Sequence, residues 1–86
     1  MKLEARITRM VGDEKLKAYA SVVIDDSFII TGIKVIEGTD HKFISMPARK
    51  GKNGTYYDIC FPITKEFRQE ITEVVLEAYK QKLEAL

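Results

Sequence analysis

The 86-residue sequence predicts an α+β fold in which an antiparallel sheet of four to five strands is followed by one C-terminal amphipathic helix. Three observations support this prediction. Apolar and polar residues alternate near the N-terminus, turn signals separate further apolar runs, and a helical apolar period appears only after residue 63. A chain of this length is expected to form one domain over residues 1–86.

The first two strands follow from alternation. Residues 3–8 place apolar side chains at every second position, which predicts a strand buried on one face. A second strand, residues 18–24, follows the turn signal at Gly12 and carries its apolar residues with the same period. Asp25 and Asp26 end it, because aspartates bind their own backbone in turns.

The next two strands lie on either side of another turn. Residues 28–36 are rich in β-branched side chains and apolar on both faces, which predicts a central strand. The turn signal at residues 38–40 precedes a short strand, residues 43–46. Pro47 ends that strand because proline cannot donate a hydrogen bond to the ladder.

A polar loop and a last strand complete the predicted sheet. Residues 48–55 form the loop, and the pair Asn53-Gly54 favours a tight turn with positive φ. Residues 56–61 are predicted to close the sheet, and Pro62 ends the strand. Cys60 is expected to be a small buried hydrophobe within this run.

The helix is predicted to begin at Thr64, whose hydroxyl suits the first free backbone N–H groups, and Glu66 suits the helix dipole. One apolar stripe is expected to be buried, formed by Phe67, Ile71, Val74, Val75 and Ala78. An acidic side carries Glu66, Glu70, Glu73, Glu77 and Glu84. A third side carries Lys65, Arg68, Thr72, Leu76, Tyr79 and Leu83.

Uncovered apolar surface predicts a homodimer. The strip of Leu76, Tyr79 and Leu83 and the second face of the sheet both need a cover, and a second copy is the simplest one. Small chains are marginally stable, and oligomerisation is a common remedy.

Several classes of function are not expected. One histidine and one cysteine cannot supply a zinc site, and His41 lies in a turn where an exposed position is expected. No glycine pattern matches a phosphate loop, so we expect neither cofactor nor catalysis. The chain is charged from Lys2 onward, has no run of about 20 apolar residues, and has a single thiol, which together predict a cytoplasmic protein without membrane insertion.

The basic segment Arg49-Lys50-Gly51-Lys52 is the strongest candidate for function. It holds three cations in four positions, and no acidic residue occurs between Asp40 and Asp58. This pattern suits contact with nucleic-acid phosphates, but it is equally typical of a solvated hairpin tip. The neighbouring Tyr56 and Tyr57 allow two interpretations in the same way, stacking on a base or packing within the fold.

The ordered motifs resemble the stage V sporulation protein G family over roughly residues 3–68. The resemblance is carried by Val35-Ile36-Glu37-Gly38, Phe43, Met46-Pro47, Arg49-Lys50, Asn53-Gly54, Tyr57-Asp58-Ile59 and Pro62-Ile63. The chain departs from the family at His41-Lys42, Ala48 and Cys60-Phe61, where the family commonly has glycine, serine and Ala-His. The missing histidine before Pro62 indicates that no histidine chemistry is required there.

The resemblance implies a small dimeric regulator that binds DNA, and in some cases RNA, and is associated with sporulation and septum formation. The residues expected to contact nucleic acid are Arg49, Lys50, Lys52, Lys65 and Arg68. They form one positive site if the loop and the helix start converge. The alternative is a protein-interaction module of the division machinery that uses the sheet edge and the helix strip.

Overall fold

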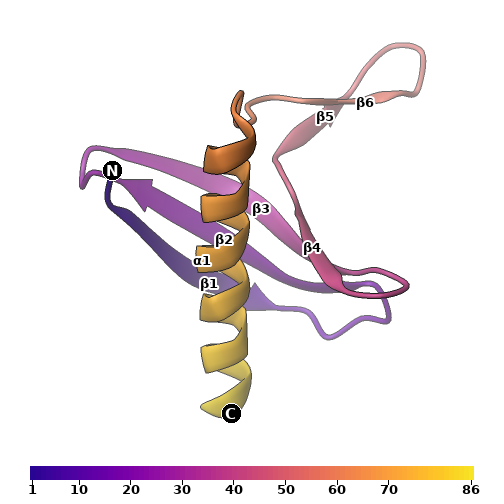
Figure 1. The fold of residues 1–86 in the computed structure, drawn as a ribbon. Helices are drawn as coiled ribbons and strands as arrows, with labels where there is room; N and C mark the ends of the chain where they lie inside the picture. The colour runs from indigo at the N-terminus through magenta and orange to yellow at the C-terminus, as the bar shows by residue number, and fades with distance from the viewer.

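The computed structural model describes residues 1–86 and contains a four-stranded antiparallel sheet, a separate two-stranded hairpin and one C-terminal helix (Figure 1). This arrangement confirms the predicted α+β class. The elements are β1 (Leu3–Met10), β2 (Leu16–Ile24), β3 (Phe28–Glu37), β4 (Lys42–Ser45), β5 (Ala48–Lys50), β6 (Tyr56–Asp58) and α1 (Lys65–Glu84).

The main sheet is an antiparallel meander in the order β1-β2-β3-β4. The two-sided apolar strand, β3, is internal, as its sequence predicts. Asp25 and Asp26 both have positive φ, 51° and 53°, which suits the tight turn between β2 and β3. Gly32, with φ of 77°, lies beside the register shift between these strands, where the positive φ of a bulge favours glycine.

Helix α1 lies across one face of the sheet (Figure 1). Its N-cap is Thr64, whose side-chain oxygen accepts a hydrogen bond from the Phe67 backbone N–H at 3.1 Å, as predicted. The core between the two layers consists of Ala18, Ala20, Val22, Ile30, Ile33, Val35, Met46, Ile71, Val75 and Tyr79.

The buried row of the helix differs from the predicted stripe. Ile71, Val75 and Tyr79 are buried, whereas Phe67 and Val74 are only partly buried. Tyr79 therefore belongs to the core, and its prediction as part of an uncovered strip is wrong. A helical wheel places two apolar rows side by side, and the direction in which the helix crosses the sheet decides which row is covered.

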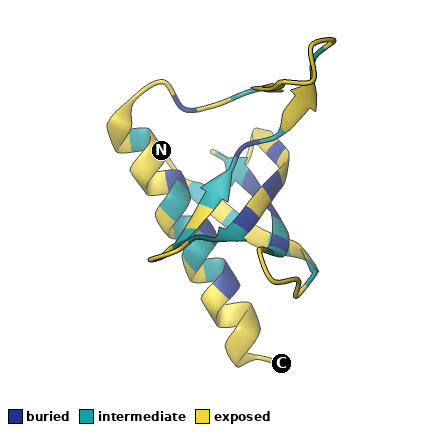
Figure 2. Ribbon diagram, turned by 90° about the vertical axis from the view of Figure 1, so that its right-hand side faces the viewer, coloured by how far each residue is buried: buried dark blue, intermediate teal, exposed yellow.

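Strands β5 and β6 pair only with each other and contact neither the main sheet nor α1. We call residues 48–58 the arm, residues 59–63 the connector, and β1–β4 with α1 the body. Every residue of β5 and β6 is exposed (Figure 2). The radius of gyration, 13.0 Å, exceeds the value of about 12 Å expected for a compact chain of this length because the arm projects.

The arm corrects two predictions. Residues 48–50 form a strand rather than the start of a loop, and the last strand ends at Asp58 and does not close the main sheet. Pro47 lies between β4 and β5 and Pro62 lies in the connector, so the paired segment is separated from the body by a residue without an N–H group at each end.

Candidate nucleic-acid interface

The arm holds its cations on a short antiparallel ribbon. Arg49 pairs with Tyr57 and Lys50 pairs with Tyr56, while Lys52 lies in the connecting turn. All three cations are exposed. Each ribbon cation therefore has an aromatic side chain directly across from it.

The turn at the arm's tip is fixed by its own hydrogen bonds. The Gly51 N–H donates to the Thr55 carbonyl at 2.8 Å. Asn53 accepts from the Thr55 N–H through Oδ1 and donates to the Tyr57 hydroxyl through Nδ2, both at 3.0 Å. Gly54 has φ of 83°, so the turn predicted from Asn53-Gly54 is confirmed. These bonds orient the Tyr57 ring on one face of the ribbon.

The charges of the arm and of the body are compensated differently. Lys2 forms ion pairs with Glu4 at 3.0 Å and Asp26 at 3.3 Å, and Lys42 pairs with Glu37 at 3.3 Å. Hydrogen bonds to Glu4 and then Asp26 raise the pKa of Lys2. Arg49, Lys50 and Lys52 form no ion pair. The positive charge of the arm therefore remains available to an anionic ligand.

The cations of the helix start lie elsewhere. Lys65 and Arg68 are exposed on the first turn of α1, but neither strand of the arm contacts the helix. Figure 1 shows the tip of the arm directed away from the helix start. Within one chain, the structure therefore brings Arg49, Lys50 and Lys52 together and keeps Lys65 and Arg68 apart from them.

Tyr56 and Tyr57 are both exposed, by 68% and 50%. Alternation along a sheet covered on one face would turn one of them inward. The arm has no second layer, so each of its faces presents one tyrosine to solvent. An exposed aromatic beside cations can stack on an unpaired base or pack on a partner.

The sequence of this chain matches the SpoVG family model over residues 1–81. The chain belongs to the SpoVG family. Three relatives carry the name "Putative septation protein SpoVG". The chain is 45% identical to the one from Treponema denticola, which covers 91% of this chain and 84% of the relative. It is 41% identical to the one from Archaeoglobus fulgidus (91% and 92%) and 43% identical to the one from Agathobacter rectalis (94% and 93%). None of these names describes an enzyme.

The connector of this SpoVG chain exposes apolar side chains, which the sequence pattern does not indicate. Cys60 is half-buried and Pro62 is buried, but Ile59, Phe61 and Ile63 are exposed by 63%, 55% and 90%. Cys60, which the sequence predicts to be buried, is therefore only half-buried, and both of its neighbours in the apolar run face solvent. The prolines at both ends of residues 47–62 are the signal that separates this run from the core.

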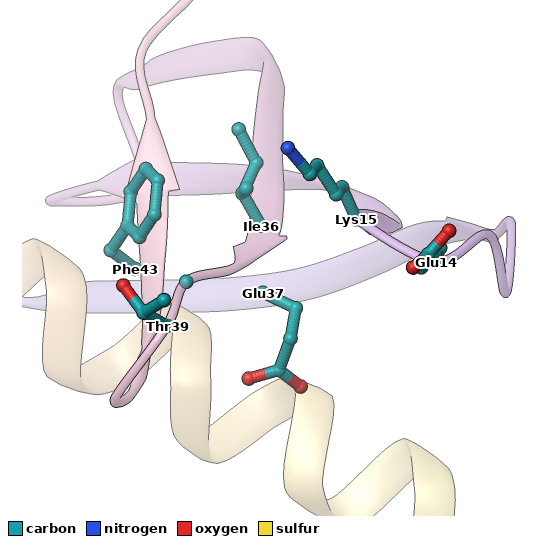
Figure 3. A pocket seen from close by; sticks show the side chains of 7 residues that line it. Glu14, Lys15, Ile36, Glu37, Thr39 and Phe43 are labelled. Atoms are coloured by element: carbon teal, nitrogen blue, oxygen red, sulfur yellow. The ribbon is translucent and has the colours of Figure 1, made fainter.

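Other sites for chemistry are sparse on the molecule. No group of three or more His, Cys, Asp or Glu side chains is placed to hold a metal ion, and His41 is exposed. A shallow pocket of about 480 Å³ lies beside the turn between β3 and β4 (Figure 3). Its Glu37 carboxylate is paired with Lys42, and Glu14 comes from a different loop, so the two carboxylates do not converge. No stretch of α1 is both long and apolar enough to qualify as a membrane span.

Proposed function

We propose that this SpoVG chain is a cytoplasmic nucleic-acid-binding regulator that acts as a homodimer, with a role in septation and sporulation. One observation carries the proposal: a two-stranded ribbon projects from the body with three unpaired cations and almost no opposing charge. The names of the relatives support the link to septation.

The shape of the arm suits a groove of duplex DNA. The major groove admits a two-stranded ribbon, and phosphate contacts from Arg and Lys position such a ribbon on the duplex. Arg49 and Lys50 lie on one strand of the ribbon, and Lys52 lies at its end. In this arrangement the cations bind the phosphates of the DNA backbone. Arg49 can also reach a base, because its guanidinium suits the edge of a guanine.

The exposed apolar side chains support the homodimer. Tyr56, Tyr57, Ile59, Phe61 and Ile63 together present on the order of 600 Å², taking about 200 Å² for one large side chain. A symmetrical pair of such surfaces would bury about 1,200 Å², at the lower end of stable interfaces. A second copy also offers a route by which Lys65 and Arg68 of one chain join the arm cations of the other.

The experiment for the nucleic-acid function is the double substitution Arg49→Ala with Lys50→Ala, read by mobility shift on duplex DNA at two salt concentrations. Each phosphate contact contributes close to one unit to the slope of log affinity against log salt, so we expect the slope to fall by about two units. The matched control is Lys80→Ala with Lys82→Ala, which removes the same charge from the far end of the helix. The site is wrong if affinity and slope both equal those of the unmodified protein while circular dichroism shows an intact fold.

The homodimer is tested by Ile63→Glu with Phe61→Glu, measured by light scattering. The unmodified protein is expected at about twice the chain mass of 9.8 kDa, and the charged variant at the chain mass itself. Glu70→Gln serves as the control for a surface change that leaves the connector intact. A mass near 9.8 kDa for the unmodified protein at micromolar concentration contradicts the dimer.

The connector also favours a second candidate function, a protein-interaction module of the septation machinery that acts without nucleic acid. Three large apolar side chains in a row suit a protein partner. Salt separates the two candidates. Phosphate binding weakens steeply as salt rises, whereas an apolar protein interface changes little.

A further inference from the structure

The sheet has a second face that the helix does not cover. Helix α1 packs on one face only, above Val22, Ile33 and Val35. On each strand, the neighbours of these buried residues point to the opposite face, because successive side chains of a strand alternate. The open face therefore carries Arg6, Arg9, Tyr19, Lys34, Ile36 and Phe43.

A row of cation, aromatic and cation crosses this face. Arg9 is directly opposite Tyr19, and Tyr19 is directly opposite Lys34. Three neighbouring strands span about 10 Å, so these side chains form one compact row. Arg6 lies on the same face, opposite Ser21. None of these three cations forms an ion pair, and Glu4, two residues before Arg6 on the same face, is already bound to Lys2 at 3.0 Å.

Phe43 adds an exposed ring beside this row. It is directly opposite Ile36, and its side chain is 42% exposed. Figure 3 shows Phe43, Ile36 and Lys15 on the side of the sheet away from the helix. Gly38 lies against the ring, because a Cβ atom there would be 3.2 Å from two ring carbons. The Gly38 backbone therefore covers one side of the Phe43 ring, and the other side faces solvent.

We propose that this open sheet face is a second nucleic-acid site, which binds a single strand. Bases stack on Phe43 and Tyr19, and phosphates contact Arg9, Lys34 and Arg6. The proposal deepens the nucleic-acid function proposed above but uses a surface separate from the arm. Single strands suit it because stacking on a protein aromatic needs a base whose face is free, and a duplex hides those faces.

Other occupants of this face fit less well. Two copies packed face to face about a two-fold axis would bring identical cation rows toward each other, and like charges at an interface cost several kcal/mol. An apolar protein surface would have to desolvate Arg6, Arg9 and Lys34, none of which is paired with an acid, because Glu4 on the same face is already bound to Lys2. A single strand supplies both the charge and the flat rings that the surface matches.

The test compares two ligands and two double variants by fluorescence anisotropy. The ligands are a dye-labelled 12-nucleotide single strand of mixed sequence and the duplex of the same sequence. Lys34→Ala with Phe43→Leu is expected to weaken single-strand binding at least about fivefold, which corresponds to one lost stacked base. Its salt slope should fall by about 0.7, the contribution of one phosphate contact on a single strand. Duplex binding should stay within twofold.

Three controls make the result decisive. Lys80→Ala removes the same charge from the helix and should leave single-strand affinity unchanged. Phe43→Tyr keeps the ring and should retain single-strand binding, which shows that an aromatic ring at this position is what the strand requires. Arg49→Ala with Lys50→Ala should weaken the duplex and spare the single strand.

Two outcomes would overturn the proposal. One is wild-type affinity of the Lys34/Phe43 double variant for the single strand, with the fold confirmed by circular dichroism. The other is a loss of single-strand binding in the arm variant, which would place the single strand on the arm. Neither outcome depends on the duplex result, so failure of this inference is distinguishable from failure of the proposed function of the arm.

Discussion

The body and the arm of this chain use apolar residues in opposite ways. Every member of the hydrophobic core lies in the body or directly after β4, and none lies in residues 48–63. The arm and the connector instead expose their large apolar side chains and three unpaired cations. One region therefore forms the core of the fold, and the other exposes apolar and cationic side chains to solvent.

This division has an energetic consequence. A two-stranded hairpin without a second layer is marginally stable in water, so the arm contributes little to the free energy of unfolding. Its order depends on the hydrogen bonds of its own turn and on the pairing of β5 with β6. Substitutions in the body should change stability, and substitutions in the arm should change binding.

The largest expected effect is in the core of the body. Ile33→Ala removes a fully buried side chain between β3 and α1 and should lower the free energy of unfolding by about 2–5 kcal/mol. Arg49→Ala with Lys50→Ala should change it by less than about 0.5 kcal/mol, because both side chains are exposed. Urea unfolding at fixed protein concentration measures both. Equal losses in the two variants would mean that the arm is part of the cooperative unit.

Two glycines allow a direct comparison of the body with the arm. At each of them an added Cβ atom would lie equally close to a neighbouring atom. A Cβ atom at Gly38 would lie 2.7 Å from the His41 carbonyl oxygen, and one at Gly51 would lie 2.7 Å from the Tyr57 ring. Backbone cannot yield, so Gly38→Ala should cost about 1–3 kcal/mol. The exposed Tyr57 ring can move at the cost of its solvent-exposed hydrogen bond from Asn53, so Gly51→Ala should cost less, about 0.5–1 kcal/mol.

Thermal unfolding of the two alanine variants checks this difference. The expected order is a clear fall in Tm for Gly38→Ala and a small fall for Gly51→Ala. The reverse order would show that the turn of the arm is held more rigidly than the turn between β3 and β4.

A smaller effect is expected where the connector meets the helix. Thr64→Ala removes the hydroxyl that accepts from the Phe67 N–H and should cost about 1 kcal/mol. For a chain of this size that loss lowers Tm by about 4–8 °C. Thr64→Ser keeps the acceptor and is the matched control. An unchanged Tm for the alanine variant would show that the first turn of α1 is stabilised by another contact.

Local chemistry in the sequence predicted most of the body. Alternation located the strands, paired aspartates located the turn between β2 and β3, and Thr64 located the start of the helix. These features are encoded within a few residues of where they act. The buried helix row was only partly predictable, because the crossing direction of α1 depends on the whole sheet.

The arm was harder to predict, although its tip was located correctly by Asn53-Gly54. The sequence of an apolar run such as Ile59-Cys60-Phe61 is the same whether its side chains are buried in a core or exposed to solvent. Periodicity reports the local conformation of a strand and not which sheet it joins. Lys65 and Arg68 are separated from the arm cations because β5 and β6 do not join the main sheet. No local sequence pattern indicates which sheet a strand joins.

The smallest expected effect concerns the acidic side of the helix. Glu73 and Glu77 are exposed and accept hydrogen bonds from Gln69 at 3.2 Å and Gln81 at 3.3 Å. Glu73→Gln with Glu77→Gln keeps an acceptor oxygen at each position and removes two negative charges that repel phosphates. Duplex affinity in a mobility shift should therefore be unchanged or up to about twofold tighter, with the same salt slope, because no cation contact is altered. A clear loss of affinity with the fold intact would place this side of α1 against the nucleic acid, and the arm would no longer be the element that enters the groove.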